Sequence, residues 1–207
     1  MIISRDLGLI DIHDCWIMMK QFTEERTTET PDQIWFVEHH PVYTLGLNSD
    51  RTHIINPVNI PVVELDRGGQ VTYHGPGQLV MYTLFDVNRL EYSVRQFVEL
   101  IENVVIEALS YCQLIAKGDR RAPGVYVDEN KIASLGIRVK KGRSYHGVAI
   151  NHINDLAPFK DINPCGIKNM SVTSLKDLNI IVDRNILVGY LELALEKILN
   201  KDIRRHE

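Results

Sequence analysis

The stretch that decides the fold is GVYVDENKIASLGIRVKKGRSYHGVAI, residues 124–150. It contains three β-rich runs, 124–127, 131–139 and 144–150, joined by two short polar turns. Runs joined by such short turns pair as antiparallel neighbours, because the chain has no room for a crossover. The sequence therefore predicts an antiparallel meander in this region.

Outside this meander, the sequence indicates further strands and a small number of helices. Apolar residues at helical spacing and short β-rich runs mark these elements. The predicted helices cover 12–26, 93–114 and 185–199; the predicted strands cover 33–38, 42–45, 60–65 and 79–87; residues 152–164 form a long loop. Strands in hairpins with few helices favour an α+β fold, with a mixed, mostly antiparallel sheet flanked by helices. A length of 207 residues suits a single domain spanning 1–207.

The bulk composition narrows the partners and the compartment. The formal net charge is −4, and 44% of residues are apolar, as in an ordinary globular protein. Neither a nucleic-acid partner nor a membrane partner is expected from this charge, and no apolar run reaches the roughly 18 residues of a bilayer span. Cys15, Cys112 and Cys165 are too scattered for a disulfide framework, which favours a reducing compartment. With no signal peptide in the first residues, we expect a cytoplasmic location.

A glycine-rich segment is the first candidate for ligand binding. Residues 67–78 read RGGQVTYHGPGQ, and four glycines in twelve residues allow the backbone to approach a ligand closely. The chain lacks a phosphate-binding P-loop and a dinucleotide fingerprint. Its eight histidines form none of the usual zinc motifs. We therefore expect no cofactor and no metal.

The second candidate is Cys165, in the polar turn sequence NPCGI at 163–167. A cysteine between proline and glycine lies outside regular helix or strand and can sit at the lip of a cleft. An inert loop thiol is the competing interpretation, and Cys15 and Cys112 are best explained as core residues. A nucleophile together with a ligand-holding loop suggests covalent catalysis.

Several motifs together carry a family resemblance. They are HPVYTLG at 40–46, RGGQVTYHGPGQLVMY at 67–82, KIASLG at 131–136, HGVA at 146–149, PCGI at 164–167 and VTSL at 172–175. In this combination the chain resembles the lipoyl(octanoyl) transferases of lipoate biosynthesis, with Leu47 as a visible departure. The resemblance implies the fold of biotin and lipoate protein ligases: a mixed sheet flanked by helices, plus a smaller sheet.

The resemblance also implies a site and a reaction. It assigns catalysis to Cys165 and Lys131, although Lys131 alone would be taken for an exposed turn residue. The implied substrate contacts are Arg67, Gly68, Gly69, Gln70, Val71, Thr72, Tyr73, His74, Ser134, Leu135, Gly136, Gly147, Val148 and Ala149. His74 is expected to brace the loop, to orient Lys131 or to hydrogen-bond the acyl carbonyl.

The implied activity is ping-pong octanoyl transfer through a thioester on Cys165. Its donor would be octanoyl-acyl carrier protein, and its acceptor the ε-amine of a lysine. That lysine belongs to the lipoyl domains of 2-oxoacid dehydrogenase acyltransferase subunits or to the glycine-cleavage H protein.

Two other functions compete with this interpretation. An ATP-dependent lipoate or biotin protein ligase on the same fold would form an acyl-adenylate and would not need a cysteine. A non-catalytic lipoyl-domain binder would keep the fold without the chemistry. Cys165 and Lys131 together favour the transferase.

Overall fold

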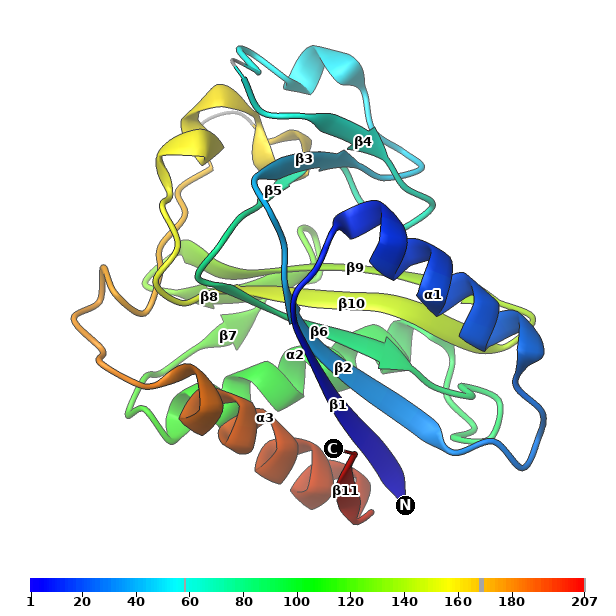
Figure 1. Cartoon of the computed structure of the whole chain (residues 1–207). Helices are drawn as coiled ribbons and strands as arrows, with labels where there is room; N and C mark the ends of the chain where they lie inside the picture. The colour runs from blue at the N-terminus through cyan, green and yellow to red at the C-terminus, as the bar shows by residue number, and fades with distance from the viewer. Residues whose placement is uncertain (58, 168–169, 207) are drawn as a thin grey trace.

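The computed structural model describes residues 1–57, 59–167 and 170–206, and of Cys165 it describes only the backbone. The predicted nucleophilic thiol of Cys165 therefore lies outside the described atoms. Within the described ranges, the fold consists of a large sheet, a small sheet and helices on both faces of the large sheet (Figure 1).

The large sheet has the strand order β11-β1-β2-β6-β10-β9-β8-β7. These strands are β1 (Ile2–Leu9), β2 (Asp32–Glu38), β6 (Gln78–Leu84), β7 (Lys117–Gly118), β8 (Gly124–Val127), β9 (Asn130–Lys140), β10 (Arg143–Asn151) and β11 (Ile203–His206). β1 pairs in parallel with β2 and β11, and the other neighbours in the sheet are antiparallel. The predicted mixed, mostly antiparallel sheet is confirmed, and so is the meander, which is formed by β8, β9 and β10.

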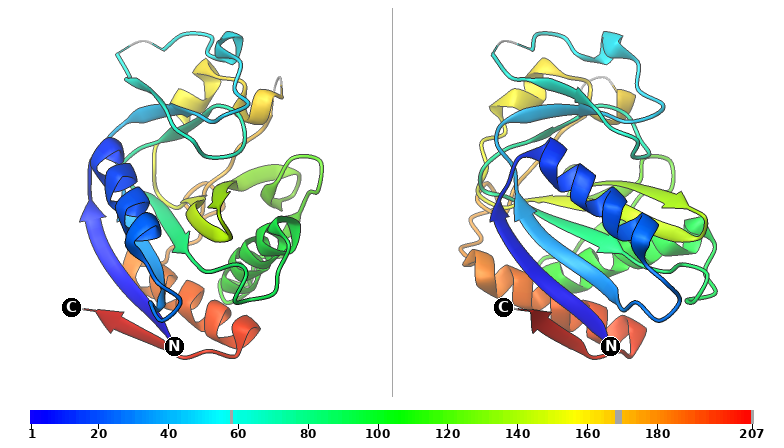
Figure 2. Two further views of the ribbon diagram at one scale, coloured as in Figure 1. Left: turned by 90° about the vertical axis from the view of Figure 1, so that its right-hand side faces the viewer. Right: turned by 45° about the vertical axis from the view of Figure 1, so that its right-hand side comes forward.

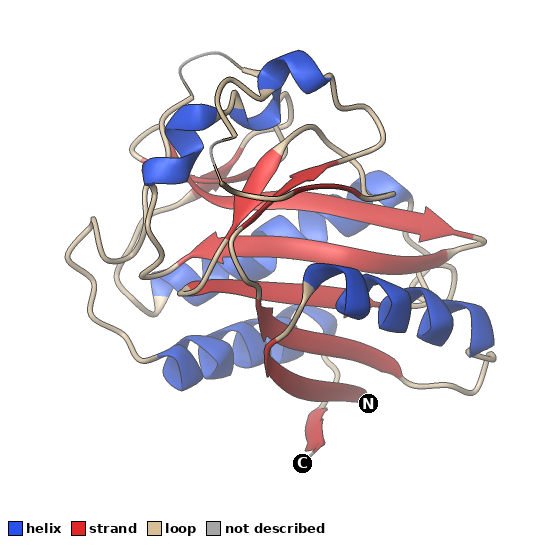
Figure 3. Cartoon of the chain, turned by 45° about the horizontal axis from the view of Figure 1, so that its top comes forward, coloured by secondary structure: helices blue, strands red, loops and turns tan. Residues whose placement is uncertain are grey.

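A smaller sheet lies beside the large one and has the order β4-β3-β5. Its strands are β3 (Val42–Leu45), β4 (Val62–Glu64) and β5 (Thr72–His74). The short helical turns η1 (Arg51–His53), η2 (Ala157–Asp161) and η3 (Pro164–Gly166) lie on the same side of the large sheet (Figure 3). The aromatic rings of Tyr43, Tyr73 and Phe159 pack together in the core of this smaller unit.

The three predicted helices are confirmed as α1 (Ile12–Glu25), α2 (Val94–Ser110) and α3 (Arg184–Leu199). Ser93 caps α2, with its Oγ accepting from the backbone N–H of Gln96 at 3.3 Å. α2 ends four residues before the predicted boundary at 114, and Gln113 then takes a left-handed φ of 61° that turns the chain. Over the described residues, no helix has both the length and the apolar character needed to cross a bilayer.

Helices cover both faces of the large sheet. Leu79, Met81 and Val148 face α2 and α3 in the larger core, whereas Val80 and Tyr82 face α1 in a second core. This division follows from the alternation of side chains along β6. Figure 2 shows α1 and α2 on opposite sides of the sheet.

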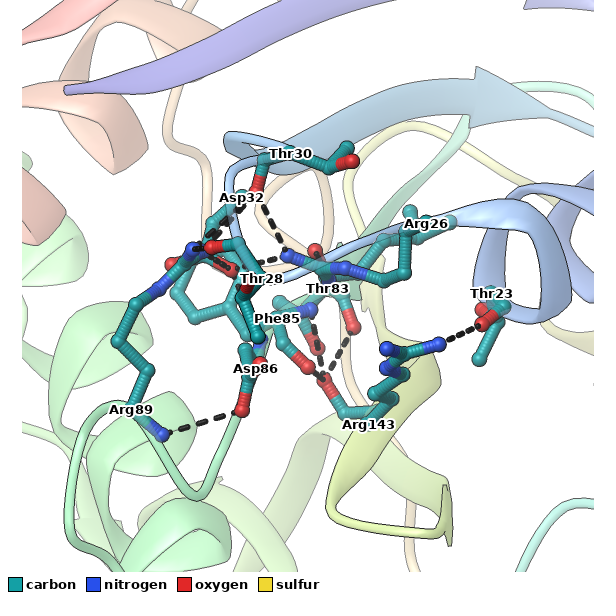
Figure 4. Close-up of polar contacts among 12 residues, drawn as sticks. Thr23, Arg26, Thr28, Thr30, Asp32, Thr83, Phe85, Asp86, Arg89 and Arg143 are labelled. Carbon is teal, nitrogen blue, oxygen red and sulfur yellow. Dashed lines mark hydrogen bonds and ion pairs between the residues drawn. The ribbon is translucent and has the colours of Figure 1, made fainter.

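A buried carboxylate ties the loop after α1 to the start of β2 and to the end of β6 (Figure 4). Oδ1 of Asp32 accepts from Arg26 Nη2 at 2.7 Å, from Arg89 Nη2 at 2.6 Å and from the backbone N–H of Asp86 at 2.8 Å. The side chain of Arg26 is fully buried, and its Nη1 also donates to the carbonyl of Leu84 at 2.9 Å. The cluster lies at the end of the sheet remote from Lys131, because Asp86 bridges to Arg143 at the start of β10, whereas Ala133, near Lys131, pairs with Ile150 at the other end of that strand.

Candidate active site

A pocket lies between the two sheets. It encloses about 500 Å³ of space when the open solvent at its mouth is included. Its floor comes from β6, β9 and β10, and its roof comes from β5 and the segment that precedes it. The lining residues are Leu65, Arg67, Gly69, Gln70, Val71, Thr72, His74, Val80, Tyr82, Ser134, Leu135, Gly136, His146, Gly147, Val148 and Ala149.

The structure brings most of the predicted substrate contacts into this one pocket, although they come from three separate motifs. Gly68 and Tyr73 are not among the lining residues. Gly68 donates its N–H to the carbonyl of Ile137 at 2.9 Å, and Tyr73 packs in the core of the smaller sheet. Sequence reasoning missed four lining residues, namely Leu65, Val80, Tyr82 and His146. The alternation along β6 was the available signal for two of these four, because every second residue of that strand faces the pocket side.

Small residues keep the floor of the pocket open. Ser134 pairs with Ala149, and Gly136 pairs with Gly147, on adjacent strands. A Cβ added to Gly136 would lie only 2.7 Å from the carbonyl oxygen of Gly68 in the roof. Glycine at this position therefore lets the roof backbone approach the floor, and the pocket narrows to a slot.

Arg67 fastens the roof to the smaller sheet. Its Nη2 donates to the carbonyl of Thr44 at 2.6 Å and to the hydroxyl of Thr44 at 2.8 Å. Both residues are buried. These charge-assisted bonds hold the roof segment in one position over the floor.

One hydroxyl in the pocket wall has no hydrogen-bond partner among the described atoms. Thr72 is only 7% exposed, and among the described atoms its Oγ1 makes no hydrogen bond. Buried polar atoms in folded proteins are almost always paired, so such an atom facing a pocket is suited to bond with a ligand.

Lys131 is buried, not exposed as its place after a turn would suggest. It is 1% accessible, and its Nζ donates to the carbonyl of Pro123 at 3.0 Å and lies 5.3 Å from the ring centre of Tyr126. A register shift in the β8–β9 pair causes this placement: Val125 pairs with Ala133, but Tyr126 pairs with Lys131. The bulge turns the lysine away from the face on which Ala133 packs, which is a common device beside active sites.

Two further features surround the Lys131 side chain. Gly124 has a φ of +148°, and a Cβ there would overlap Cε of Lys131. Oε1 of Glu102 accepts from the N–H of Gly124 at 2.8 Å. Burial raises the pKa of Glu102 above its usual range, while the Gly124 N–H and the charge of Lys131 oppose this rise.

Residues that follow Cys165 in the chain bond to the backbone of Lys131, and Gly166 lies near the pocket lining. The Lys131 N–H donates to the carbonyl of Ser171 at 2.9 Å, and the Thr173 N–H donates to the Lys131 carbonyl at 3.0 Å. On the other side, a Cβ at Gly166 would lie 3.4 Å from Cγ of Gln70, a residue of the pocket lining. Lys131 itself does not line the pocket. Ser134, which does, lies three residues further along β9, or about 10 Å of strand.

A chain of buried side-chain hydrogen bonds links the pocket to this segment. His74 Nδ1 lies 2.7 Å from Gln78 Oε1, Gln78 Nε2 donates to Asn151 Oδ1 at 2.9 Å, and Asn151 Nδ2 donates to the carbonyl of Thr173 at 3.0 Å. Burial, and then the charges of His39 and Arg67, lower the pKa of His74 to about 3. The ring is therefore neutral, with the proton on Nδ1, and its Nε2 accepts hydrogen bonds. This arrangement suits bracing of the loop and not donation to an acyl carbonyl.

Among the described residues, the buried histidines do not form a metal centre. The rings of His39 and His74 lie 5.9 Å apart, but His39 Nδ1 bonds the carbonyl of Ile10, and its Nε2 bonds the hydroxyl of Tyr82. Within the described ranges, no group of three or more His, Cys, Asp or Glu side chains has the geometry to hold a metal ion.

Comparisons with known proteins agree with this architecture. The family model for the lipoyl protein ligase A/B catalytic domain matches residues 11–195. The octanoyltransferase of Nitrosomonas eutropha is 47% identical over 187 residues, covering 90% of this chain and 83% of that protein. The octanoyltransferase of Laribacter hongkongensis is 52% identical over 176 residues, covering 85% of each chain.

Solved structures show the same fold at low sequence identity. A bipartite lipoate protein ligase from Thermoplasma acidophilum, described with its E2 lipoyl domain, aligns with a TM-score of 0.80 at 14% identity, covering 100% of this chain and 87% of that one. The biotin protein ligase of Aquifex aeolicus aligns with a TM-score of 0.57 at 13% identity, covering 97% of this chain and 69% of that one. The predicted biotin and lipoate ligase-like fold is confirmed.

Proposed function

Because the chain belongs to the lipoyl protein ligase A/B catalytic domain family, we propose that it transfers an octanoyl group in lipoate biosynthesis. The observation that carries the proposal is the sequence identity of this chain to proteins named octanoyltransferase, which is 47% and 52% over most of both chains. The narrow pocket with a largely apolar lining supports it, since an acyl chain needs such a slot.

The donor in this proposal is octanoyl-acyl carrier protein, and the acceptor is a lysine ε-amine of a lipoyl domain or of the glycine-cleavage H protein. The lipoate ligase of Thermoplasma acidophilum, which has this fold, was described with its E2 lipoyl domain. A lipoyl domain is therefore a reasonable protein substrate for this chain as well. The two protein substrates would bind in turn at one mouth of the pocket.

In the first half of the reaction, the Cys165 thiolate attacks the octanoyl thioester, and the carrier thiol leaves with a proton. In the second half, the lysine amine attacks the acyl group on Cys165, loses a proton and forms an amide, which releases the thiolate. In this proposal Lys131 stabilises the thiolate and carries these protons. Each half exchanges one acyl bond for another, so the cycle is complete without ATP.

Surroundings of the other two cysteines support Cys165 as the nucleophile. Burial raises the pKa of the Cys15 thiol to about 12 and also raises the pKa of Cys112. Neither residue forms much thiolate at neutral pH. The proposal for Cys165 is supported instead by its neighbour Gly166, which lies near Gln70 of the pocket lining, and by Ser171 and Thr173 further along the chain, which bond to the backbone of Lys131.

Within the pocket, the acyl chain lies along the floor of small residues on β9 and β10. The hydroxyl of Thr72 donates to the acyl oxygen, which gives this buried group a partner that it lacks among the described protein atoms. The hydrogen bonds from His74 through Gln78 and Asn151 to the carbonyl of Thr173 hold the roof of the pocket in a fixed position relative to the segment that follows Cys165.

The test is octanoyl transfer from octanoyl-acyl carrier protein to a lipoyl domain, followed by mass spectrometry with and without ATP. We expect transfer without ATP, its loss in Cys165→Ser, and its retention in the matched control Cys112→Ser. Transfer only with ATP and free octanoate would establish a ligase instead. Binding of the lipoyl domain with no transfer under either condition would establish a non-catalytic binder.

A further inference from the structure

The backbone of β10 is strained at a single residue on the pocket wall. His146 has a φ of +62°, a left-handed conformation that is costly for a side chain of this size. Neighbouring strand residues normally point to opposite faces. Here Tyr145 and His146 both reach Asp66, so the unusual φ turns the imidazole onto the pocket side of the sheet.

Asp66 holds this imidazole in place. Its Oδ1 accepts from His146 Nε2 at 3.1 Å and from Trp16 Nε1 at 2.7 Å, and its Oδ2 accepts from the Tyr145 hydroxyl. Burial opposes ionisation of Asp66, but the bonds from His146, Tyr145 and Trp16 lower its pKa well below the usual range. The histidine is 2% exposed and packs 6.1 Å, ring centre to ring centre, from Tyr82. It is a fixed wall and not a mobile surface group.

The strand register gives the position of this wall within the pocket. Along β9 the order from the Lys131 end is Ser134 and then Gly136, both of which line the floor. His146 pairs with Ile137, one residue further on. The imidazole therefore stands at the end of the floor remote from Lys131, about 20 Å of strand away.

We propose that His146, held by Asp66, closes the distal end of the acyl pocket and sets the length of the acyl chain that the enzyme accepts. The inference rests on the proposed function, because it takes the reacting carbonyl to lie at the Lys131 end. The terminal methyl group then meets the imidazole of His146. A longer chain finds no space, since the ring is fixed by its bond to Asp66 and by its contact with Tyr82.

The test compares His146→Gly with the wild type in acyl loading from hexanoyl, octanoyl, decanoyl and dodecanoyl carrier protein. Glycine adopts a φ of +62° without strain, so this change removes the ring and leaves the strand path intact. His146→Asn is the second variant, because asparagine also tolerates this conformation and is smaller than histidine. Tyr145→Phe is the matched control, since it removes another donor to Asp66 without changing the pocket lining.

We expect the wild type to favour octanoyl over decanoyl by at least about 10-fold in kcat/KM, because one methylene in a closed pocket is worth about 10- to 200-fold. His146→Gly should bring this ratio to about 1 or invert it, His146→Asn should lower it in part, and Tyr145→Phe should keep it. Unchanged chain-length ratios in both His146 variants would overturn the inference while leaving octanoyl transfer standing. Failure of the wild type to load any acyl chain would overturn the proposed function, and this inference with it.

Discussion

Replacing Gly124 by alanine tests whether the position of Lys131 controls the chemistry. The new Cβ would overlap Cε of Lys131 and would lie 2.5 Å from the carbonyl oxygen of Ala133. The lysine side chain must therefore move by the order of an ångström, and a misplacement of that size costs about 100-fold in rate. The φ of +148° adds about 1–3 kcal/mol of backbone strain, and the overlap adds about 1–3 kcal/mol more.

Octanoyl transfer and urea unfolding, measured on the same preparations, separate the two effects. We expect Gly124→Ala to lose about 2–6 kcal/mol of unfolding free energy and, while still folded, about 100-fold in transfer rate. Lys131→Met should lose at least as much activity with the glycine intact. Gly189→Ala in α3 is the matched control, because its Cβ would find Arg205 Nη2 no closer than 3.8 Å. Near-normal transfer by folded Gly124→Ala and by Lys131→Met would refute a catalytic role for the lysine.

Three further perturbations follow from the same contacts. Gly75→Ala would place a Cβ 2.7 Å from Cζ of Tyr73, so transfer should fall more than the urea midpoint, and a loss of stability alone would make this turn purely structural. Asp32→Ala leaves the buried Arg26 guanidinium without its carboxylate and should cost about 3–5 kcal/mol in urea unfolding; a loss below about 1 kcal/mol would contradict this assignment. Burial lowers the pKa of His39 to about 4, so between pH 6.5 and 4 the imidazole of His39 is protonated in the unfolded chain but not in the folded one. The free energy of unfolding should therefore fall by about 3 kcal/mol as the pH is lowered from 6.5 to 4. A His39→Gln variant whose unfolding free energy falls equally over this range would rule out His39 as the source.

The local patterns predicted much of the fold. The polar turns of the meander and the helical spacing of apolar residues depend on nearest neighbours, and β8, β9, β10 and all three helices appear where they were expected. β1 and β11 were not predicted. β1 pairs in parallel with strands distant in sequence, so its partners leave no local turn signal.

The site was less accessible to sequence reasoning than the fold. The family motifs pointed to most of the pocket lining, but they did not predict that Lys131 is buried. That burial depends on a one-residue bulge opposite Val125 and Tyr126, and the spacing of residues in the sequence does not predict such a bulge. The wall at His146 depends likewise on a single left-handed φ and on a carboxylate eighty positions away, Asp66. Both features are set by tertiary contacts.

The central claim is that the octanoyl group passes through Cys165. Its most direct test is incubation of the wild-type protein with octanoyl-acyl carrier protein in the absence of ATP, followed by intact mass measurement and peptide mapping. We predict the gain of one octanoyl group, located on Cys165 and released when a lipoyl domain is added. Acylation of Cys15 or Cys112 instead, or transfer of the octanoyl group without a detectable octanoyl-enzyme, would contradict the account.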